Sequence, residues 1–380
     1  MSKSSAVSIR QCFADVADPR RDHLRLHNLW EIIAITILAV VSGADSWVEV
    51  AKYGVNKFDF LRTFLELPNG IPSHDTFGRV FALLKPRALQ DGFVKWVQAV
   101  AESTVGRVVA IDGKTARRSF DKAAGKGPLH MVSAWATENR LLLGQQACDG
   151  KSNEITAIPE LIKNIEISGA IVTIDAMGCQ KDIVAAIRKA GADYVLAVKD
   201  NQPTLHDDIR ATFTMGLDNN FADMEHHRYC TTEKSHGRIE TRIYDIVRVT
   251  EDLVARHPDW KDLHSIGMVY SERQEGNKEP SIETRVFITS LQPKVKRFAR
   301  AVRNHWGIET TLHWVLDIGF REDESRLRKG HGQENMALIR RLSASLLLNE
   351  PTCKAGVACK RKCAGWNDEY LLRVLAASLK

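Results

Sequence analysis

The sequence predicts an α/β protein in which helices flank a mixed β-sheet, a helical domain precedes the sheet, and a β-rich insertion interrupts it before the last helices. Three features of the chain predict this fold. Apolar residues recur at three- and four-residue spacing up to about residue 100, which is typical of amphipathic helices. From Gly106 onward short β-type runs appear and then alternate with helical segments, as parallel strands with crossover helices do. Residues 218–292 return to β-type runs.

The expected elements follow the chain in order. Three N-terminal helices are expected at Leu29–Ser42, Ser46–Leu61 and Pro86–Thr104. Three strands are expected next, at Arg107–Asp112, His130–Thr137 and Arg140–Ala147, the last two as a hairpin turning at Glu138-Asn139. The alternating part consists of helix Glu154–Ile167, strand Ala170–Met177, helix Gln180–Ala190 and strand Asp193–Val198. The insertion is expected to have strands at Tyr229–Thr232, Arg238–Val249, His264–Ser271 and Glu283–Thr289.

These elements divide the chain into five parts. They are an N-terminal helical domain at 1–104, the first part of the α/β core at 105–217, the β-rich insertion at 218–292, the remainder of the core with two helices at 293–350, and a C-terminal helical tail at 351–380. A chain of 380 residues, 44% hydrophobic and 26% charged, is expected to form two or three packed units rather than a single core.

Composition and targeting signals favour a protein of the cytoplasm. The longest apolar run, Ile33–Val41, is shorter than the ~20 residues of a membrane span, so a buried helix is expected there and no membrane contact. The first residues lack the apolar stretch of a secretory signal. Seven cysteines are scattered without the spacing of a disulfide framework, which fits reduced thiols. Cys353, Cys359 and Cys363 also lack zinc-site spacing, so unpaired cysteines are the preferred interpretation.

The net charge of +6 is concentrated near the C-terminal end of the chain. Residues 291–380 carry 17 Lys and Arg against 9 Asp and Glu, which gives +8. Release of counterions would favour such a region on a polyphosphate partner. On charge alone, contact with a nucleic acid and a chance distribution are equal alternatives.

Two aspartates stand at the ends of apolar, β-forming runs. Asp112 follows Val108–Ile111, and Asp175 follows Ile171–Ile174. Ligand sites in open α/β sheets gather at the carboxyl ends of strands, so both acids are candidates for chemistry. The alternative for each is that its side chain only starts a turn near Gly113 or Gly178.

Glu309 is a third candidate. If Lys294–Leu316 formed one helix, ~100° of rotation per residue would place Glu309 on the apolar stripe with Phe298, Val302 and Leu312. A buried carboxylate needs a cation. The structural alternative is an ion pair with Arg303 or His305.

Three carboxylates that converge repel one another unless a divalent cation offsets their charge. Oxygen ligands suit Mg²⁺ or Mn²⁺. Two such ions support in-line displacement at a phosphodiester. The cluster Asp112, Asp175 and Glu309 therefore predicts phosphoryl transfer on DNA or RNA.

Several motifs around these acids form a specific set. They are Ala110–Lys114, Lys151–Pro159, Asp175–Asp182, Glu233–Arg238 and Arg303–Glu309, with Asp18–Arg20 and Gly70–Thr76 in the N-terminal part. By these segments the chain resembles the bacterial DDE insertion-sequence transposases of the H-repeat-associated group, which is linked to Rhs elements. The resemblance spans nearly the whole chain.

The resemblance implies a ribonuclease-H-like core in which Asp112 and Asp175 lie on adjacent strands and Glu309 on a later helix. It also implies Mg²⁺ or Mn²⁺ as cofactor, two ions, and an enzyme that cleaves DNA at element ends and joins the exposed 3′-hydroxyl to target DNA. The partners implied are double-stranded DNA at the element ends and target DNA, with a dimer assembled on DNA. Two alternatives are a hydrolytic nuclease on the same core and a domesticated or inactive DNA-binding protein.

Other residues are expected to contact DNA. The wider group has Tyr, Arg and Lys where this chain has Val302, His305 and Leu316, so the handling of DNA ends is expected to differ. Trp306 is retained, and the group's pattern implies that it stacks on a base, although plain helix packing explains it equally well. The remaining candidates for phosphate contact are Lys199, His236, Arg238, His305, Arg326, Arg328 and Lys329, followed by Arg340 and Arg341.

Overall fold

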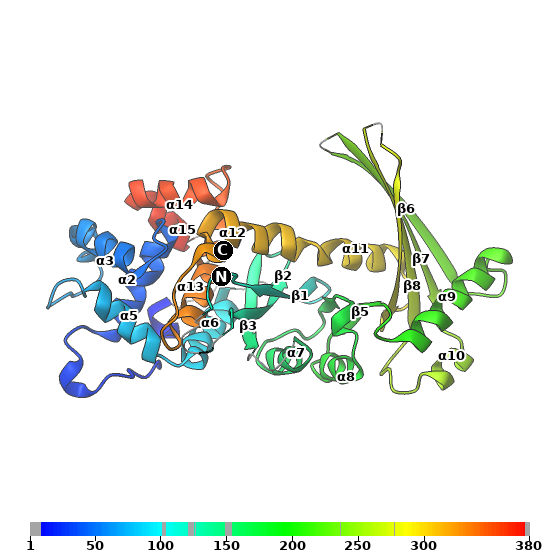
Figure 1. Ribbon diagram of the computed structural model, residues 1–380, viewed down its shortest axis with the longest axis horizontal. Coiled ribbons are helices and arrows are strands. Elements are labelled where there is room, and N and C mark those ends of the chain that lie inside the picture. The colour runs from blue at the N-terminus through cyan, green and yellow to red at the C-terminus, as the bar shows by residue number, and fades with distance from the viewer. Residues whose placement is uncertain are drawn as a thin grey trace, which may run out of the picture. The chain divides into compact units, whose positions relative to one another are not determined.

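The computed structural model describes residues 9–100, 104–120, 125, 127–148, 154–235, 237–276 and 278–376. Its Cα atoms fall into two compact units, and each is described by itself. The first unit comprises Met1–Ser103, Gly113–Asn153 and Ile308–Lys380, and the second comprises Thr104–Asp112 and Glu154–Gly307. Segments that are distant in sequence therefore come together in both units. Helices and strands are mixed throughout the described residues (Figure 1), which confirms the predicted α/β class.

The first unit is mainly helical and includes one hairpin. Its N-terminal helices are α1 (Ile9–Cys12), η1 (Asp22–Leu24), α2 (Leu29–Val41), α3 (Trp47–Asn56), α4 (Phe58–Leu61), α5 (His74–Leu83) and α6 (Pro86–Val100). Its strands are the end of β1 (Val108–Thr115), β2 (His130–Ala136) and β3 (Leu141–Cys148). Its C-terminal helices are the π-helix η3 (Ile308–His313), α12 (Trp314–Phe320), η4 (Glu322–Glu324), α13 (Gly332–Asn349), α14 (Val357–Trp366) and α15 (Asp368–Ala376).

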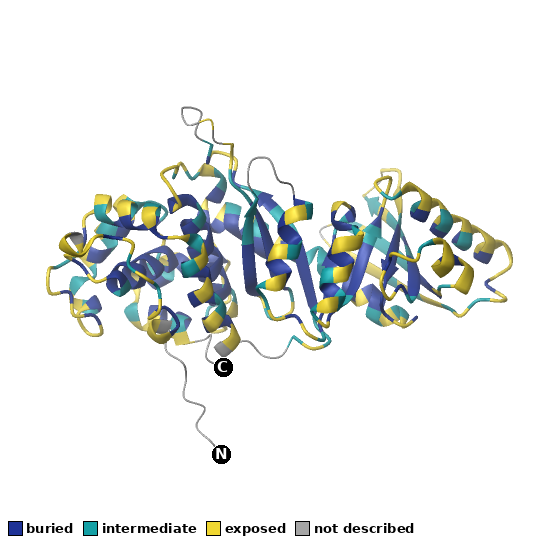
Figure 2. Cartoon of the chain, turned by 90° about the horizontal axis from the view of Figure 1, so that it is seen from below, coloured by how far each residue is buried: buried dark blue, intermediate teal, exposed yellow. Residues whose placement is uncertain are grey.

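Helix α2 is buried on all sides, which explains its long apolar run. Asn28 caps its start by accepting a hydrogen bond from Trp30 N, and every residue but Trp30 is buried. Even the early Glu31 is buried, because its Oε1 accepts a hydrogen bond from Leu67 N at 2.8 Å. Figure 2 shows the buried residues gathered inside this helical part. Among the described residues, no helix is both long and apolar enough to cross a membrane.

The segment expected as a single helix at Ser46–Leu61 is two helices. Ser46 and Glu49 form a reciprocal capping box that starts α3. The helix stops at Lys57, whose backbone leaves the helical region, and α4 begins immediately after it. The Lys57 Nζ pairs with Asp368 Oδ1 at 2.7 Å, so this break holds the α3–α4 corner against α15.

Helix α13 is the central element of the first unit. Fifteen of its 18 residues are buried, Arg340 and Arg341 among them. Its Ser345 Oγ accepts a hydrogen bond from Leu142 N of β3 at 3.2 Å, and its Asn335 donates to the carbonyl oxygens of Phe81 and Leu84, both at 2.8 Å. The predicted hairpin at His130–Ala147 is confirmed, since β2 and β3 pair antiparallel from His130↔Cys148 to Ala136↔Leu141.

The second unit contains most of the strands. Its elements are the first part of β1, α7 (Glu154–Lys163), β4 (Ile171–Ile174), η2 (Ala176–Gly178), α8 (Lys181–Lys189), β5 (Asp193–Val198), α9 (Pro203–Asp218), β6 (His226–Ser235), β7 (Arg238–Arg248), α10 (Glu251–Arg256), β8 (Ser265–Glu275), β9 (Ser281–Thr289) and α11 (Val295–His305). The predicted strand Asp193–Val198 is confirmed residue for residue. The strand expected at Ala170–Met177 is shorter and ends at Ile174, because Asp175 caps a 3-10 turn.

The strand pairing joins the expected β-rich insertion to the α/β part of this unit. β1 pairs parallel with β4, and β4 pairs parallel with β5. β9 pairs antiparallel with β5 from Val195↔Thr289 to Val198↔Val286, and β8, β7 and β6 follow in antiparallel order. The later strands thus extend one sheet and do not fold back as a separate layer.

Helices cover both faces of the parallel strands. Figure 1 shows α7 and α8 on one face and α11 on the other. The face under α11 is an apolar core in which Val108, Ile171 and Val195 of the three parallel strands pack with Phe298 and Val302. Phe298 also fits against Gly267 of β8, where an added Cβ would lie 2.3 Å from its ring. Helix α11 is therefore fixed across both the parallel and the antiparallel strands.

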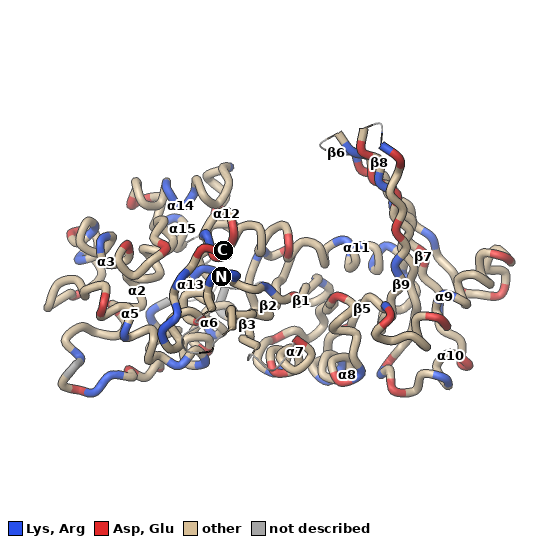
Figure 3. The backbone as a smooth tube through the Cα atoms, viewed as in Figure 1, with Lys and Arg blue, Asp and Glu red and all other residues tan. Residues whose placement is uncertain are grey.

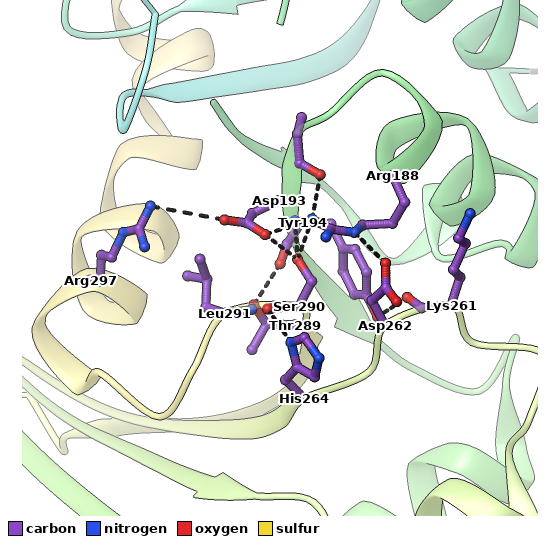
Figure 4. A network of polar contacts seen from close by, with 11 residues as sticks. Arg188, Asp193, Tyr194, Lys261, Asp262, His264, Thr289, Ser290, Leu291 and Arg297 are labelled. Atoms are coloured by element: carbon purple, nitrogen blue, oxygen red, sulfur yellow. Dashed lines mark hydrogen bonds and ion pairs between the residues drawn. The ribbon is translucent and has the colours of Figure 1, made fainter. Parts of the chain in front are cut away.

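A polar network connects the start of β5 to the end of β9 (Figure 4). Arg188 Nη1 of α8 donates to Asp193 Oδ1 at 2.7 Å and to Ala192 O at 2.8 Å, and its Nε donates to Asp262 Oδ2 at 2.8 Å. Ser290 Oγ donates to Asp193 Oδ1 at 2.9 Å. Because these bonds connect α8, β5, β9 and the loop before β8, they fix the register of the later strands.

Candidate active site

Asp112 and Asp175 occupy equivalent places on neighbouring parallel strands. The last register pair of β1 and β4 is Ile111↔Ile174. Asp112 and Asp175 are the residues that immediately follow this pair. Neighbouring strands lie ~4.8 Å apart, and residues in register share one face of a sheet. Both acids are partly exposed. The two acids therefore lie at adjacent positions, directly after the point where the pairing of β1 with β4 stops.

Asp112 does not end its strand. β1 continues to Thr115, and Ala116 N then donates to Leu129 O at 2.9 Å, which prolongs the extended chain toward β2. The expectation of a strand end at Asp112 was wrong, because only the pairing with β4 stops at Ile111. The turn-starting alternative fails for the same reason.

Asp175 does start a turn, and this leaves part of its carboxylate available. Its Oδ1 accepts hydrogen bonds from Met177 N at 3.1 Å and Gly178 N at 3.3 Å. Gly178 is required there, because an added Cβ would lie 2.2 Å from the Ile174 side chain. The capping bonds orient the carboxylate through one oxygen and keep the second oxygen out of that turn. The structural and functional interpretations of Asp175 are thus compatible.

His305 lies beside these two acids and is partly buried. Its Nδ1 is 3.1 Å from Thr173 Oγ1, and Thr173 lies two residues before Asp175, on the same face of β4. Burial lowers the pKa of His305 to about 4, although the nearby Asp175 raises it. The ring is therefore largely neutral at neutral pH, and the contact of His305 with DNA stays a prediction.

Trp306 is covered on one face by a guanidinium. The Arg285 Cζ lies 4.7 Å from the centre of its ring, a cation–π contact, and the His305 ring meets it edge-on at 6.1 Å. The side chain is partly exposed. Both earlier interpretations of Trp306, base stacking and helix packing, therefore remain open.

Glu309 lies in the first unit, and its surroundings differ from the expectation. The helix expected at Lys294–Leu316 is broken after His305, and Glu309 falls in the π-helix η3. Glu309 is exposed, whereas its neighbours Ile308 and Leu312 are buried. The prediction that Glu309 lies on the apolar stripe was wrong, because a π-helix has i→i+5 bonding and rotates later side chains out of the 100° phase. Single π-helical turns are frequent at functional sites.

The proposed ion-pair partners of Glu309 are engaged elsewhere. Arg303 Nη2 donates to Glu233 Oε2 at 2.7 Å, and His305 bonds Thr173. Among the residues that the structure describes, no group of three or more His, Cys, Asp or Glu side chains is arranged to hold a metal ion. Asp112 and Asp175, directly after the last paired residues of β1 and β4, nevertheless supply carboxylate oxygens, the kind of donor that fits Mg²⁺ or Mn²⁺.

Comparison with known proteins identifies the family. Residues 103–347 match the family model described as "Transposase DDE domain", and residues 10–97 match "DDE_Tnp_1-associated". The chain is 40% identical over 355 residues to "H repeat-associated putative transposase YhhI" of Escherichia coli (strain K12), which covers 93% of each chain.

The chain belongs to the DDE transposase family. It is also 40% identical over 375 residues to "Putative transposase YncI" of Escherichia coli O157:H7, covering 98% of this chain and 95% of that protein. A third relative, "Putative protein YbfL" of Escherichia coli (strain K12), is 41% identical over 355 residues, or 93% of each chain. The resemblance to the H-repeat-associated group is confirmed.

The predicted DNA-contact residues of this DDE transposase differ in their exposure. Lys199 is exposed directly after β5, and Arg238 is partly exposed at the start of β7. Arg326, Arg328 and Lys329 are exposed in the segment between η4 and α13. His236 lies outside the described residues. Figure 3 marks the positions of all described Lys and Arg residues.

Arg340 and Arg341 of the transposase do not form part of a DNA surface. Both are buried, with 3% and 1% of their surface exposed. Arg341 Nη1 pairs with Glu322 Oε1 at 2.8 Å, and its Nε donates to Ser133 Oγ at 3.2 Å. The interpretation of these two residues as phosphate contacts was wrong. Lys360 and Arg361 are buried too, so the C-terminal excess of charge is only partly at the surface.

The motif Ala110–Lys114 of the transposase ends in a buried cation for which the sequence alone predicted no role. Lys114, two residues after Asp112, is buried, and its Nζ lies 2.7 Å from Asp317 Oδ1 and 3.4 Å from Asp323 Oδ1. It connects β1 with α12 and η4 inside the first unit. The apolar run followed by Asp-Gly-Lys could have predicted this role, because a Lys so close to a buried strand requires anionic partners.

His313 at the end of η3 predicts a pH dependence of transposase stability. Its pKa is lowered to about 3, mainly by burial and also by Arg341 and Lys114, from an ordinary value of 6.5. The unfolded chain therefore takes up this proton at a higher pH than the folded chain. The neutral His313 ring therefore makes its full contribution to the free energy of unfolding above pH 6.5. This contribution is lost as the pH falls toward 3, at up to about 1.4 kcal/mol per pH unit.

Urea unfolding of the wild type and His313→Gln at pH 7, 6 and 5 measures this effect. We expect the variant to be less stable at pH 7 but to lose less stability on acidification. An identical pH dependence in the two proteins would contradict the burial of a neutral His313.

Proposed function

We propose that the chain cleaves DNA at the ends of its insertion sequence and joins the exposed 3′-hydroxyl to target DNA, with Asp112, Asp175 and Glu309 holding the metal ions. The observation that carries this proposal is the register Ile111↔Ile174, which brings the next residues, Asp112 and Asp175, to adjacent positions. Membership of the DDE transposase family supports the assignment of the third acid to Glu309.

The core is proposed to be ribonuclease-H-like. Parallel pairing of β1 with β4 and of β4 with β5, together with the β2–β3 hairpin, supports this proposal. The strands β6 to β9 would be the insertion at 218–292, although β9 continues the pairing from β5. The domains proposed remain those at 1–104, 105–217, 218–292, 293–350 and 351–380.

The acids are proposed to hold two Mg²⁺ or Mn²⁺ ions. When bound, such ions would activate a water or a 3′-hydroxyl and stabilise the leaving oxygen of an in-line displacement. Asp175 is held by backbone amides of η2 through one oxygen, which orients its other oxygen without moving the chain. His305 is held beside Asp175 by the contact of its Nδ1 with Thr173 Oγ1 at 3.1 Å.

The substrate is proposed to be double-stranded DNA at the element ends and then target DNA. Lys199 and Arg238 are proposed to contact phosphates near the cut, and Trp306 to stack on a base after Arg285 moves away. A dimer on DNA and a cytoplasmic location complete the proposal. An assay with element-end duplexes, Mg²⁺ and a supercoiled target tests it: cleavage followed by joining supports a transposase, cleavage alone a nuclease, and binding alone an inactive DNA-binding protein.

Glu309→Gln separates a metal ligand from a structural residue. Because Glu309 is exposed on η3, loss of its charge is expected to leave the free energy of unfolding within ~0.5 kcal/mol of the wild type. We expect DNA binding to persist and Mg²⁺- and Mn²⁺-dependent cleavage to be lost. The matched control is Glu66→Gln, which neutralises another exposed acid of the first unit. Cleavage at the wild-type rate by Glu309→Gln would remove Glu309 from the proposed site.

A further inference from the structure

A cavity in the first unit is lined by positive charge. It has a volume of about 600 Å³ and lies between the start of α3, the helix α5 and the segment that joins η4 to α13. The residues on its wall that matter for the argument are Trp47, Asp75, Arg79, Arg326, Arg328 and Lys329. The cavity contains none of the acids Asp112, Asp175 and Glu309.

The cations of this cavity lack acidic partners among the described residues. Arg326 and Lys329 are exposed, and Arg328 lies with its Cζ 5.5 Å from the Phe120 ring. Arg79 donates through Nε to the backbone oxygen of Asp75 at 3.3 Å. The only acid on the wall is Asp75, whose carboxylate is 3.6 Å from His74. Four positive charges around one concave surface repel one another, and a polyanion relieves this repulsion.

The wall of the cavity is held in place by its own contacts. Trp47 stacks on Phe81 with ring centres 4.9 Å apart and an angle of 12° between the planes. The segment that carries the cations is fastened to α5, since His331 N donates to Ala82 O at 3.0 Å. Gly330 is needed there, because its φ is +52° and an added Cβ would lie 2.3 Å from the same oxygen. The cavity is therefore formed before a ligand arrives.

The direction of the nearby helices strengthens its positive potential. α3 begins at Trp47, α5 at His74 and α13 at Gly332, and each of these residues lines the cavity. Helix N-termini carry partial positive charge and favour phosphate groups. These termini add to the four cationic side chains.

We propose that this cavity binds the sugar–phosphate backbone of duplex DNA, as a contact separate from the site of cleavage. The proposal rests on the proposed function in that it takes DNA as the substrate. The cationic side chains belong to α5 and to the segment at 326–329, so the positive charge is spread along the rim of the cavity and is not concentrated at one point. Such a distribution suits a polymer of phosphates better than a single phosphate group, and arginine side chains match phosphate oxygens in pairs.

The test compares two triple variants of the full chain in EDTA, so that no cleavage occurs. The cavity variant is Arg79→Gln, Arg326→Gln and Arg328→Gln. The control is Arg10→Gln, Lys52→Gln and Arg62→Gln, which removes the same charge from exposed positions of the first unit that do not line the cavity. The probe is a fluorescent 30-base-pair duplex of random sequence, and anisotropy gives Kd over a range of salt concentrations.

We expect the cavity variant to bind at least about tenfold more weakly at low salt, and the slope of log K against log salt to fall by about 2 to 3, at ~0.9 per phosphate contact. The control should keep the wild-type slope. Equal slopes and affinities in the two variants would overturn the proposal.

Two further measurements keep this test separate from the proposed function. Modification of wild-type arginines with phenylglyoxal should be blocked at Arg79, Arg326 and Arg328 by the duplex but not by dAMP at equal phosphate concentration. Equal protection by dAMP would overturn the assignment to a polymer. Cleavage by the wild type in Mg²⁺ is measured independently: its absence would refute the proposed chemistry, whereas the binding comparison would still decide the role of the cavity.

Discussion

Asp175→Asn is expected to reduce Mg²⁺-dependent cleavage of element-end DNA by at least about 10³-fold, because it removes a negative charge from the group proposed to hold the metal. The fold should persist. The Asn side-chain oxygen still accepts the hydrogen bonds that Met177 N and Gly178 N donate to Asp175, so η2 keeps its cap. Cleavage rates are to be measured at saturating DNA, and the thermal midpoint is to be measured on the same samples.

The matched control is Asp182→Asn, which neutralises an exposed acid in the first turn of α8. It should cleave DNA at close to the wild-type rate. If Asp175→Asn kept more than a tenth of the wild-type rate, or lost activity only in proportion to unfolding, Asp175 would be a capping residue and not a metal ligand.

Arg341→Met is expected to have the largest effect on stability, a loss of about 3–5 kcal/mol in the free energy of unfolding. Arg341 pairs with Glu322 Oε1 at 2.8 Å, and the two side chains are 1% and 3% exposed. Removing the guanidinium leaves the Glu322 carboxylate buried without its cation and leaves Ser133 Oγ without a donor. Urea unfolding at pH 7 measures the loss.

Arg87→Met serves as the control for this variant. Arg87 pairs with Asp91 at 2.8 Å, but both side chains are more than half exposed. Exposed helix pairs contribute ~0.3–0.5 kcal/mol, so the control should unfold close to the wild type. Similar losses in Arg341→Met and Arg87→Met would contradict a buried ion pair at the centre of the first unit.

The fold was predicted well from sequence where a run of apolar residues is compatible with only one type of secondary structure. The run Ile171–Ile174 is β-branched and bounded by a turn, and it forms β4. The helix at Leu29–Val41 was also expected within one residue. Asp112 and Asp175 were chosen as candidates because each follows a run of apolar residues, although only the run before Asp175 ends its strand.

The errors arise where distant residues decide the local structure. Glu309 was placed on a continuous helix, but α11 ends at His305 and Glu309 lies in the π-helix that follows. The spacing of apolar residues does not reveal this change of helix type. Arg340 and Arg341 were counted as surface charge, although Arg341 bonds Glu322 and Ser133 and Arg340 donates to Asp45 O, all inside the first unit. The pairing of β9 with β5 depends on Arg188, Asp193 and Ser290 from three elements, and no single segment predicts it.

The proposal that Asp112, Asp175 and Glu309 hold the same metal ions can be tested by iron-directed cleavage of the polypeptide. Replacing Mg²⁺ with Fe²⁺ and adding ascorbate and peroxide produces radicals that cut the polypeptide near the bound ion, and mass spectrometry locates the cuts. We expect cuts close to residues 112, 175 and 309 together, all suppressed by excess Mg²⁺ and all lost in Asp175→Asn. Cuts near 112 and 175 without any near 309, or cuts insensitive to Mg²⁺, would contradict it.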